Sequence, residues 1–265
     1  MYLFDTHAHL NDARLMPERV ELVARAADAD VKYINVVGYD FASSFNAVKI
    51  AKEFENVYAT IGIHPHDADE WTAEHADEFR QLLDNHEENK IVGIGEIGFD
   101  LHFPDRHADE VQKQAFIGQM ELAYEYDLPV SIHSRDAADM TLANLAELKE
   151  AGKLHEKPGV IHCFDYGVDE AKRFEKFNFL FGVDGPVTFK NGEDKRELVR
   201  YLPLEKILLE TDCPYMAPEP YRGKRNEPSL IPFIGKKIAE EKGLSFEHLA
   251  EVTTNNGLEL FRIKK

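Results

Sequence analysis

The sequence predicts an α/β fold, a TIM-type (β/α)8 barrel formed by a single domain over residues 1–265 and extended by an extra C-terminal helix. Two observations support this fold class. Eight apolar or β-branched segments alternate with amphipathic helical stretches, and the length of 265 residues is common for a barrel of one domain. Parallel strands need crossover connections, which are usually helical, so eight strand–helix units favour a parallel sheet closed on itself.

Eight segments have the composition of buried parallel strands. We expect strands at Tyr2–Asp5, Tyr33–Val37, Val57–Ile61, Ile91–Gly95, Val130–His133, Val160–His162, Phe179–Gly182 and Ile207–Thr211. Helical patterns lie between them, as in Asp109–Tyr126, where apolar side chains recur at the period of an α-helix. Leu230, Ile234 and Ile238 repeat this period near the end of the chain, and Ser245 is suited to cap the last helix.

An open, doubly wound sheet is the alternative fold. Its usual mark is a glycine-rich phosphate-binding turn directly after the first strand, and this sequence has none there. Gly93, Gly95 and Gly98 resemble such a turn, but they lie in and after the fourth predicted strand, with no helix directly following. We therefore expect these glycines to allow close backbone approach at the rim of a barrel.

The composition restricts the partners that the protein can bind. A net charge of −18 disfavours wrapping around duplex DNA, so an anionic substrate must be recognised by metal ions and a local basic patch. No run of about 18 apolar residues is present, and the chain begins without a basic, apolar signal region. We expect a cytoplasmic protein with no membrane partner, and no sequence feature indicates an obligate protein partner.

Residues with metal-binding side chains follow the predicted strands. His7 and His9 lie two apart on an extended segment, which points both imidazoles to the same side. A lone histidine at a strand end is more often a hydrogen-bonded structural residue, but candidate ligands recur here at the ends of five strands. The six are His7, His9, Glu96, His133, His162 and Asp212. Because barrel active sites form at the C-terminal ends of strands, we expect this set to hold two divalent cations, with Glu96 bridging them.

A basic cluster follows the eighth predicted strand. Arg222, Lys224 and Arg225 lie where barrels often bind phosphate, which favours a phosphate clamp over a merely solvated loop. His64 ends the third predicted strand and is expected on the same side of the barrel.

Motifs along essentially the whole chain resemble those of the TatD family, metal-dependent deoxyribonucleases of the amidohydrolase-like superfamily. They are DTHAH at 5–9, GIHPH at 62–66, GIGEIGFD at 93–100, PVSIHSRD at 129–136, HCF at 162–164, ETDCP at 210–214 and RGKRNEP at 222–228. The resemblance implies a TIM barrel, dependence on divalent metals and hydrolysis of phosphodiester bonds in DNA, often as a 3′–5′ exonuclease that prefers single strands.

The resemblance also implies a role for each candidate residue. It assigns His7, His9 and Asp212 to one metal, His133 and His162 to the second, Glu96 to both, and His64, Arg225 and Asn226 to phosphate. Two departures from the family pattern are visible. Asp165-Tyr166-Gly167 follows the HCF motif in place of the usual Ser-Gly, and Gly98-Phe99-Asp100-Leu101, followed by His102, replaces the usual Gly-Leu-Asp-Tyr. Neither changes a predicted ligand, but a carboxylate at Asp165 is expected to weaken or redirect the binding of an anionic nucleic acid.

The predicted ligands suit a metal-assisted in-line displacement at phosphorus. Two cations would lower the pKa of a bridging water, and Asp212 is the expected proton acceptor, so Asp212 and Glu96 are the candidate catalytic residues. Phosphodiester chemistry is compatible with Mg²⁺, whereas histidine-rich coordination also favours Zn²⁺, Mn²⁺ or Fe²⁺.

Two other functions are compatible with the sequence. A metal-dependent hydrolase of an amide, ester or lactone could use the same ligands, and the acidic net charge favours a small substrate. Many such enzymes bridge their metals with a carboxylated lysine on the fourth strand, whereas this chain has Glu96 there and a basic cluster suited to phosphate. A non-catalytic binding scaffold usually lacks one or more ligands, and all six are present here.

Overall fold

The computed structural model describes residues 2–264, and it contains one sheet of eight parallel strands in chain order. The strands are β1 Leu3–Ala8, β2 Val31–Val37, β3 Val57–Ile61, β4 Ile91–Asp100, β5 Val130–Arg135, β6 Gly159–Ile161, β7 Leu180–Val183 and β8 Ile207–Leu209. A parallel bridge between Ala8 and Cys213 joins the last segment to the first, so the sheet forms a barrel. The predicted fold class is confirmed.

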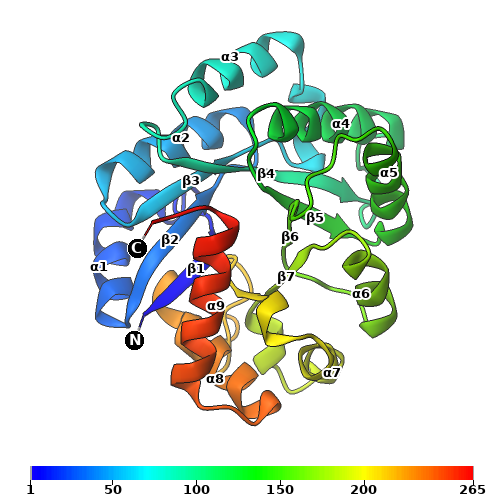
Figure 1. The fold of residues 1–265 in the computed structure, drawn as a ribbon. Coiled ribbons are helices and arrows are strands. Elements are labelled where there is room, and N and C mark those ends of the chain that lie inside the picture. The colour runs from blue at the N-terminus through cyan, green and yellow to red at the C-terminus, as the bar shows by residue number, and fades with distance from the viewer. Residues whose placement is uncertain (1, 265) are drawn as a thin grey trace.

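Helices cover the outside of the barrel (Figure 1). They are α1 Arg19–Asp28, α2 Phe41–Glu53, α3 Ala73–Leu83, α4 Asp109–Glu125, α5 Ala138–Glu150, α6 Val168–Glu175, α7 Glu193–Tyr201, α8 Ile231–Lys242 and α9 Phe246–Leu260. Short 3-10 helices occur at Met16–Glu18, Pro65–Glu70, Gly185–Thr188, Leu204–Lys206 and Pro228–Leu230. The side chain of Ser245 accepts a hydrogen bond from the amide of His248 and caps α9, as predicted.

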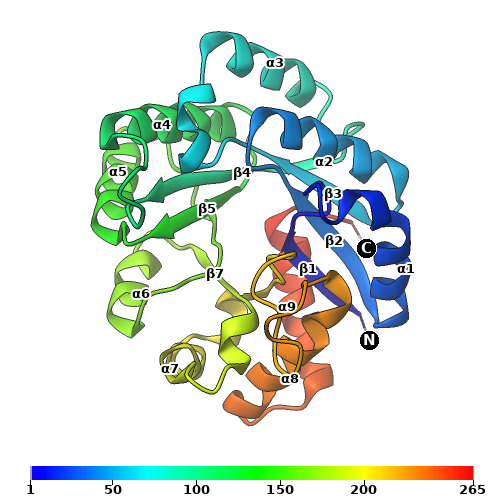
Figure 2. The same cartoon turned by 180° about the vertical axis from the view of Figure 1, so that it is seen from behind.

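The last helix packs against the N-terminal end of the barrel. Leu258 and Phe261 belong to an apolar cluster that includes Phe4 of β1 and the early residues of several other strands. The rings of Phe4 and Phe261 lie 6.0 Å apart between centroids. Figure 1 shows α9 in front of the strands, and Figure 2, turned by 180°, shows it behind them. Because α9 covers this end, the opposite end is left for the polar side chains.

Strand β4 is longer than the sequence analysis predicted. The expected strand ended at Gly95, whereas β4 continues to Asp100 because residues 97–100 pair with β5. Gly98 permits this pairing: its φ is 142°, and a Cβ atom at this position would lie 1.9 Å from the carbonyl oxygen of His133. The expected close backbone approach is therefore present, and Glu96 lies within a strand instead of directly after one.

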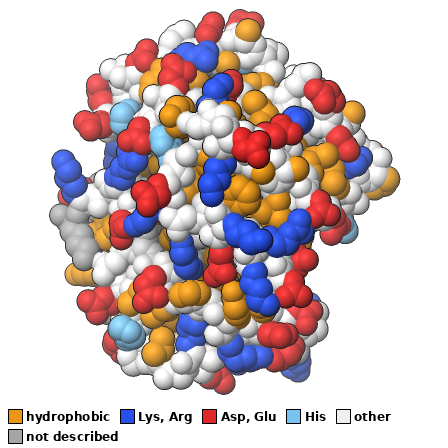
Figure 3. All heavy atoms as spheres, turned by 45° about the vertical axis from the view of Figure 1, so that its right-hand side comes forward, with side chains coloured by type: hydrophobic (Ala, Val, Ile, Leu, Met, Phe, Trp, Pro, Cys, Tyr) orange, Lys and Arg blue, Asp and Glu red, His pale blue; other side chains and the backbone are white. Residues whose placement is uncertain are grey.

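Among residues 2–264, no helix has the length and apolar character needed to cross a membrane. On the face shown in Figure 3, basic and acidic side chains are interspersed, and this face shows no continuous basic surface.

Candidate metal centre

The six predicted ligands meet at the C-terminal end of the barrel. His7 lies in β1 and His9 directly follows it, Glu96 lies in β4 and His133 in β5, while His162 and Asp212 follow β6 and β8. Five of the six are buried and His133 is partly buried. Groups of three of these side chains place their ligand atoms within 4.8 Å of one another. The structure therefore brings together all six residues that the sequence analysis singled out as metal ligands.

The carboxylate of Glu96 lies between two pairs of histidines. Its Oε1 atom is 2.9 Å from Nδ1 of His133 and 2.8 Å from Nε2 of His162. Its Oε2 atom is 3.5 Å from Nε2 of His7 and 3.7 Å from Nε2 of His9. Each oxygen therefore faces one pair of nitrogen donors, which is the arrangement that a carboxylate bridging two cations requires.

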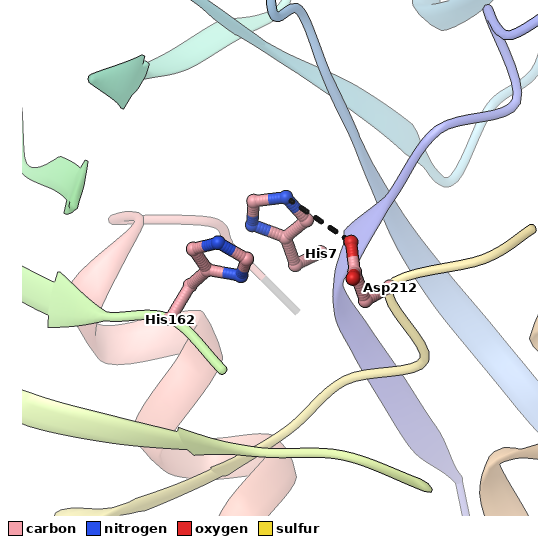
Figure 4. A group of neighbouring side chains, drawn as sticks. All are labelled: His7, His162 and Asp212. Atoms are coloured by element: carbon pink, nitrogen blue, oxygen red, sulfur yellow. Dashed lines mark ion pairs between the residues drawn. The ribbon is translucent and has the colours of Figure 1, made fainter. Parts of the chain in front are cut away.

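Asp212 completes the side of the cluster that is formed by β1. Its Oδ1 atom is 3.2 Å from Nε2 of His9 and 3.9 Å from Nε2 of His7. Figure 4 shows the carboxylate of Asp212 directed toward the ring of His7, with the ring of His162 beside it. The rings of His7 and His162 are stacked, with centroids 3.9 Å apart. A backbone hydrogen bond holds Asp212 beside β1, because the amide of Asp212 donates to the carbonyl of His7 at 2.9 Å.

Neighbouring groups orient two of the histidines toward the centre. Nδ1 of His9 bonds the carbonyl of Val37 at 2.9 Å, and Nδ1 of His7 lies 3.2 Å from the hydroxyl of Ser131. Metal-binding histidines characteristically use the second ring nitrogen in this way, which fixes the ring and the tautomer. The Nε2 atoms of His7 and His9, 3.2 Å apart, are thereby left to face one shared point.

The electrostatics of the cluster also fit a bound cation. Burial lowers the pKa of His9, but the hydrogen bond and charge of Asp212 outweigh burial and raise it to about 9. Burial also lowers the pKa of His133, but the hydrogen bonds of His133 to Asp100 and Glu96 outweigh burial and raise this pKa to about 9. Burial raises the pKa of Glu96, yet the surrounding histidines hold it well below its ordinary value. The carboxylates thus need positive charge beside them, and a divalent cation would supply it in place of protons.

Asp100 is a residue of this site that the sequence analysis did not identify. It is fully buried, and its Oδ2 atom lies 3.1 Å from Nε2 of His133 and 3.1 Å from Nε2 of His66. Burial raises the pKa of this carboxyl, but the hydrogen bonds from His133 and His66 hold it well below its ordinary value. Asp100 therefore accepts from the outer nitrogen of His133 and leaves Nδ1 for the centre.

His64 lies closer to the ligands than a phosphate contact alone would require. Its Nε2 atom is 3.5 Å from Oε1 of Glu96, and its ring packs edge-on against that of His133. His64, Asp100 and His133 form a further group with donor atoms within 4.8 Å of one another. Burial lowers the pKa of His64 well below its ordinary value, so its ring is neutral and able to accept or donate one hydrogen bond.

A cavity of about 800 Å³ opens over this cluster. Arg222 lines it, and its guanidinium makes no ion pair among residues 2–264 but donates a hydrogen bond to Oδ1 of Asn191 at 3.2 Å. The rest of the predicted basic cluster lies elsewhere. Arg225 pairs with Glu18 at 2.7 Å, Lys224 lies over the ring of Tyr221, and Asn226 is buried with its side-chain amide donating to backbone carbonyls.

The two departures from the family motifs have local explanations. The carboxylate of Asp165 lines the cavity but pairs with Lys195, so part of its charge is neutralised. The hydroxyl of Tyr166 bonds Ser134 Oγ and the amide of Ala137 and serves to join two loops. His102 points to Asp136 at 2.8 Å.

A (β/α)8 barrel with histidines and carboxylates converging at the C-terminal strand ends defines a metal-dependent hydrolase of the amidohydrolase superfamily. The chain matches the family model described as TatD related DNase over residues 4–262. It belongs to the TatD-related DNase family.

Similar proteins cover the chain almost completely. It is 41% identical over 261 residues to "Uncharacterized metal-dependent hydrolase YabD" of Bacillus subtilis (strain 168), covering 98% of this chain and 99% of the relative. It is 33% identical over 267 residues to "3'-5' ssDNA/RNA exonuclease TatD" of Shigella flexneri serotype 5b (strain 8401), covering 98% and 99%. Among solved structures, YJJV, a TatD homologue from Escherichia coli K12, has a TM-score of 0.87 at 27% identity, covering 99% and 98% of the two chains.

Proposed function

We propose that this protein is a nuclease that hydrolyses phosphodiester bonds of DNA, acting as a 3′–5′ exonuclease on single strands. The observation that carries the proposal is the carboxylate of Glu96 between two histidine pairs, beneath a cavity whose wall presents the unpaired guanidinium of Arg222. Relatives of 33% identity that bear the name of a 3′–5′ ssDNA/RNA exonuclease support it.

The proposed ligand assignment is the one that the family resemblance implies, and the short distances among His7, His9 and Asp212 support it. His7, His9 and Asp212 would hold one divalent cation, His133 and His162 the second, and Glu96 would bind both. The nitrogen and oxygen donors suit Zn²⁺, Mn²⁺, Fe²⁺ or Mg²⁺. Cations bound there supply positive charge to the phosphate oxygens and lower the pKa of water.

The side chains of the protein perform the remaining steps. Burial raises the pKa of Asp212, but its contact with His9 outweighs this and keeps it below its ordinary value, so the carboxylate is ionised at neutral pH. Asp212 would accept the proton of the attacking water at a carboxylate oxygen. Arg222 would bind a phosphate oxygen, and neutral His64 would hydrogen-bond to the same group.

The direct test is digestion of end-labelled single- and double-stranded oligonucleotides by protein reconstituted with each candidate metal. We expect stepwise shortening from the 3′ end of single strands, lost on chelation and restored by metal. A panel of lactones and dipeptides runs in parallel. Hydrolysis of one of these with intact oligonucleotides would instead support a small-molecule hydrolase on the same barrel.

Two arginines separate a phosphate contact from a structural contribution of the loop after β8. Arg222 lines the cavity, whereas Arg225 is paired with Glu18 outside it. Loss of a charge-assisted hydrogen bond to phosphate would raise KM roughly 10- to 100-fold in Arg222→Ala. Arg225→Ala is expected to raise KM less. Equal effects of the two variants would argue against phosphate binding by Arg222.

A further inference from the structure

Three arginine–aromatic contacts surround the cavity. The guanidinium carbons of Arg135, Arg14 and Arg222 lie 4.5, 4.6 and 4.0 Å from the ring centroids of Phe103, Tyr215 and Phe189 respectively. All three rings line the cavity. Elsewhere in residues 2–264 the cations found over aromatic rings are lysines. Arginine is therefore combined with aromatic rings at this site alone within the described chain.

Two of these aromatic residues are partly exposed to solvent. Phe103 is 39% exposed and Tyr215 is 47% exposed, although each has an arginine against it. Large exposed aromatic side chains in a cavity indicate a binding role more often than a packing role. Histidine rings also lie near them, with His66 and His102 at 5.3 and 5.1 Å from Phe103 and His9 at 6.4 Å from Tyr215 between centroids. The exposed part of each ring is what a planar ligand can contact.

The supporting arginines are themselves held in place. Nε of Arg135 lies 3.1 Å from Oδ2 of Asp100, and Arg14 donates to both carboxylate oxygens of Asp12 at 2.8 and 2.7 Å. Because each charge already has a carboxylate partner, these arginines orient the rings instead of neutralising phosphate. Arg222 has no carboxylate partner in residues 2–264, and only its Nη1 donates to a side chain, Oδ1 of Asn191 at 3.2 Å, so the rest of its guanidinium is available for phosphate.

The two exposed rings lie on opposite walls of the barrel mouth. Phe103 follows β4 and Tyr215 follows β8, and in a ring of eight strands in chain order these two strands face each other. The metal-binding cluster lies between them, since its ligands come from β1, β4, β5, β6 and β8. A ligand that contacts both rings must therefore pass over the cluster.

We propose that Phe103 and Tyr215 are stacking platforms for the two nucleobases that flank the scissile phosphate. This inference rests on the proposed nuclease function and specifies its substrate as a single strand with unpaired terminal bases. Stacking on a ring face uses no base-edge hydrogen bond, so recognition is tolerant of sequence. It also supplies binding energy that does not depend on the overall charge, which matters for a protein with a net charge of −18.

The test removes nucleobases from the substrate and, separately, the aromatic rings of Phe103 and Tyr215 from the protein. The substrates are a hexathymidylate and versions with one abasic residue at the 3′-terminal, the penultimate or the 5′-terminal position. With wild-type protein and saturating metal, either 3′ abasic residue should lower kcat/KM roughly 5- to 150-fold, whereas the 5′ one should not. Phe103→Ala and Tyr215→Ala should each cause a loss of similar size on the intact strand. Each should also become insensitive to one of the two 3′ abasic positions.

Conservative and distant variants serve as controls. Phe103→Tyr and Tyr215→Phe keep a ring and should retain the sensitivity to both abasic positions. Tyr201→Ala removes another exposed tyrosine with a cation over it, Lys172 at 5.7 Å, that does not line the cavity, and should behave as wild type.

The outcomes distinguish the two proposals. If wild-type protein cleaves the intact strand but tolerates every abasic residue, or if the alanine variants keep full sensitivity, the stacking proposal is overturned and the nuclease proposal stands. If wild-type protein neither binds nor cleaves the strand, both proposals are overturned together.

Discussion

Replacing Asp100 by asparagine tests how the site holds His133. Two histidine nitrogens face Oδ2 of this buried carboxylate at 3.1 Å, from His133 and His66, and Nε of Arg135 lies at the same distance as an ion-pair partner without hydrogen-bond geometry. The other oxygen accepts the amide of His102 at 3.0 Å, which favours keeping a carbonyl oxygen there in Asp100→Asn. The new amide group would then present its own N–H to Nε2 of His133 and Nε2 of His66, and would remove the charge beside Arg135.

The expected loss follows from this geometry. A hydrogen bond to a charged group contributes about 1.5–3 kcal/mol, which corresponds to roughly 10- to 100-fold in affinity. We expect metal binding at the site of His133 and His162 to weaken by about this factor, because Nδ1 of His133 is no longer held toward the centre. Raised metal concentration should restore part of the turnover.

The assay is competition for metal against a chromophoric chelator, with turnover measured over a series of metal concentrations. Asp136→Asn is the matched control, because Asp136 is an exposed carboxylate that directly follows the neighbouring strand β5 and pairs with His102 outside the cavity. Wild-type metal affinity and turnover in Asp100→Asn would refute the role of Asp100 as a positioning residue.

Three further predictions concern the proton acceptor, the metal and the packing beneath the site. Asp212→Asn should lower turnover roughly 10²- to 10⁴-fold with an unchanged circular dichroism spectrum, and near-normal turnover would remove Asp212 from its assigned role. Metal at 100 times its Kd should stabilise the protein by about 2.7 kcal/mol and raise Tm by roughly 5–10 °C; equal Tm values with and without chelator would contradict a preformed site. Gly182→Ala places a Cβ atom 2.3 Å from both carboxylate oxygens of buried Glu210, and should cost about 1–3 kcal/mol in urea unfolding. An unchanged unfolding midpoint would show that Glu210 moves freely.

The sequence predicted the barrel and the ligands because both follow from local patterns. Strand and helix periods identify the elements, and one topological rule brings all C-terminal strand ends to the same place. The positions of His7, Glu96 and His162 within those patterns were therefore sufficient to predict that they meet.

Side chains whose roles depend on distant partners were harder to predict. Arg225 was grouped with Arg222, but its direction is set by Glu18, 207 residues earlier in the chain. Asp100 was also missed, because the predicted strand ended at Gly95. Its spacing of four residues from Glu96 on an extended segment was a usable signal, since alternate residues of a strand point to the same side.

The exposure of Phe103 and Tyr215 could not be predicted from the sequence. An aromatic residue after a strand is usually expected to pack inward, whereas the structure leaves both residues partly exposed with Arg135 and Arg14 packed against their rings.

The central claim is that Glu96 lies between two cations held by the histidines and Asp212. Anomalous diffraction from crystals soaked in Mn²⁺, recorded at a wavelength where manganese scatters anomalously, tests it directly. We predict two peaks on either side of the Glu96 carboxylate, one beside His7, His9 and Asp212 and the other beside His133 and His162. Peaks remote from these side chains, or no peak at a Mn²⁺ concentration that supports activity, would contradict the account.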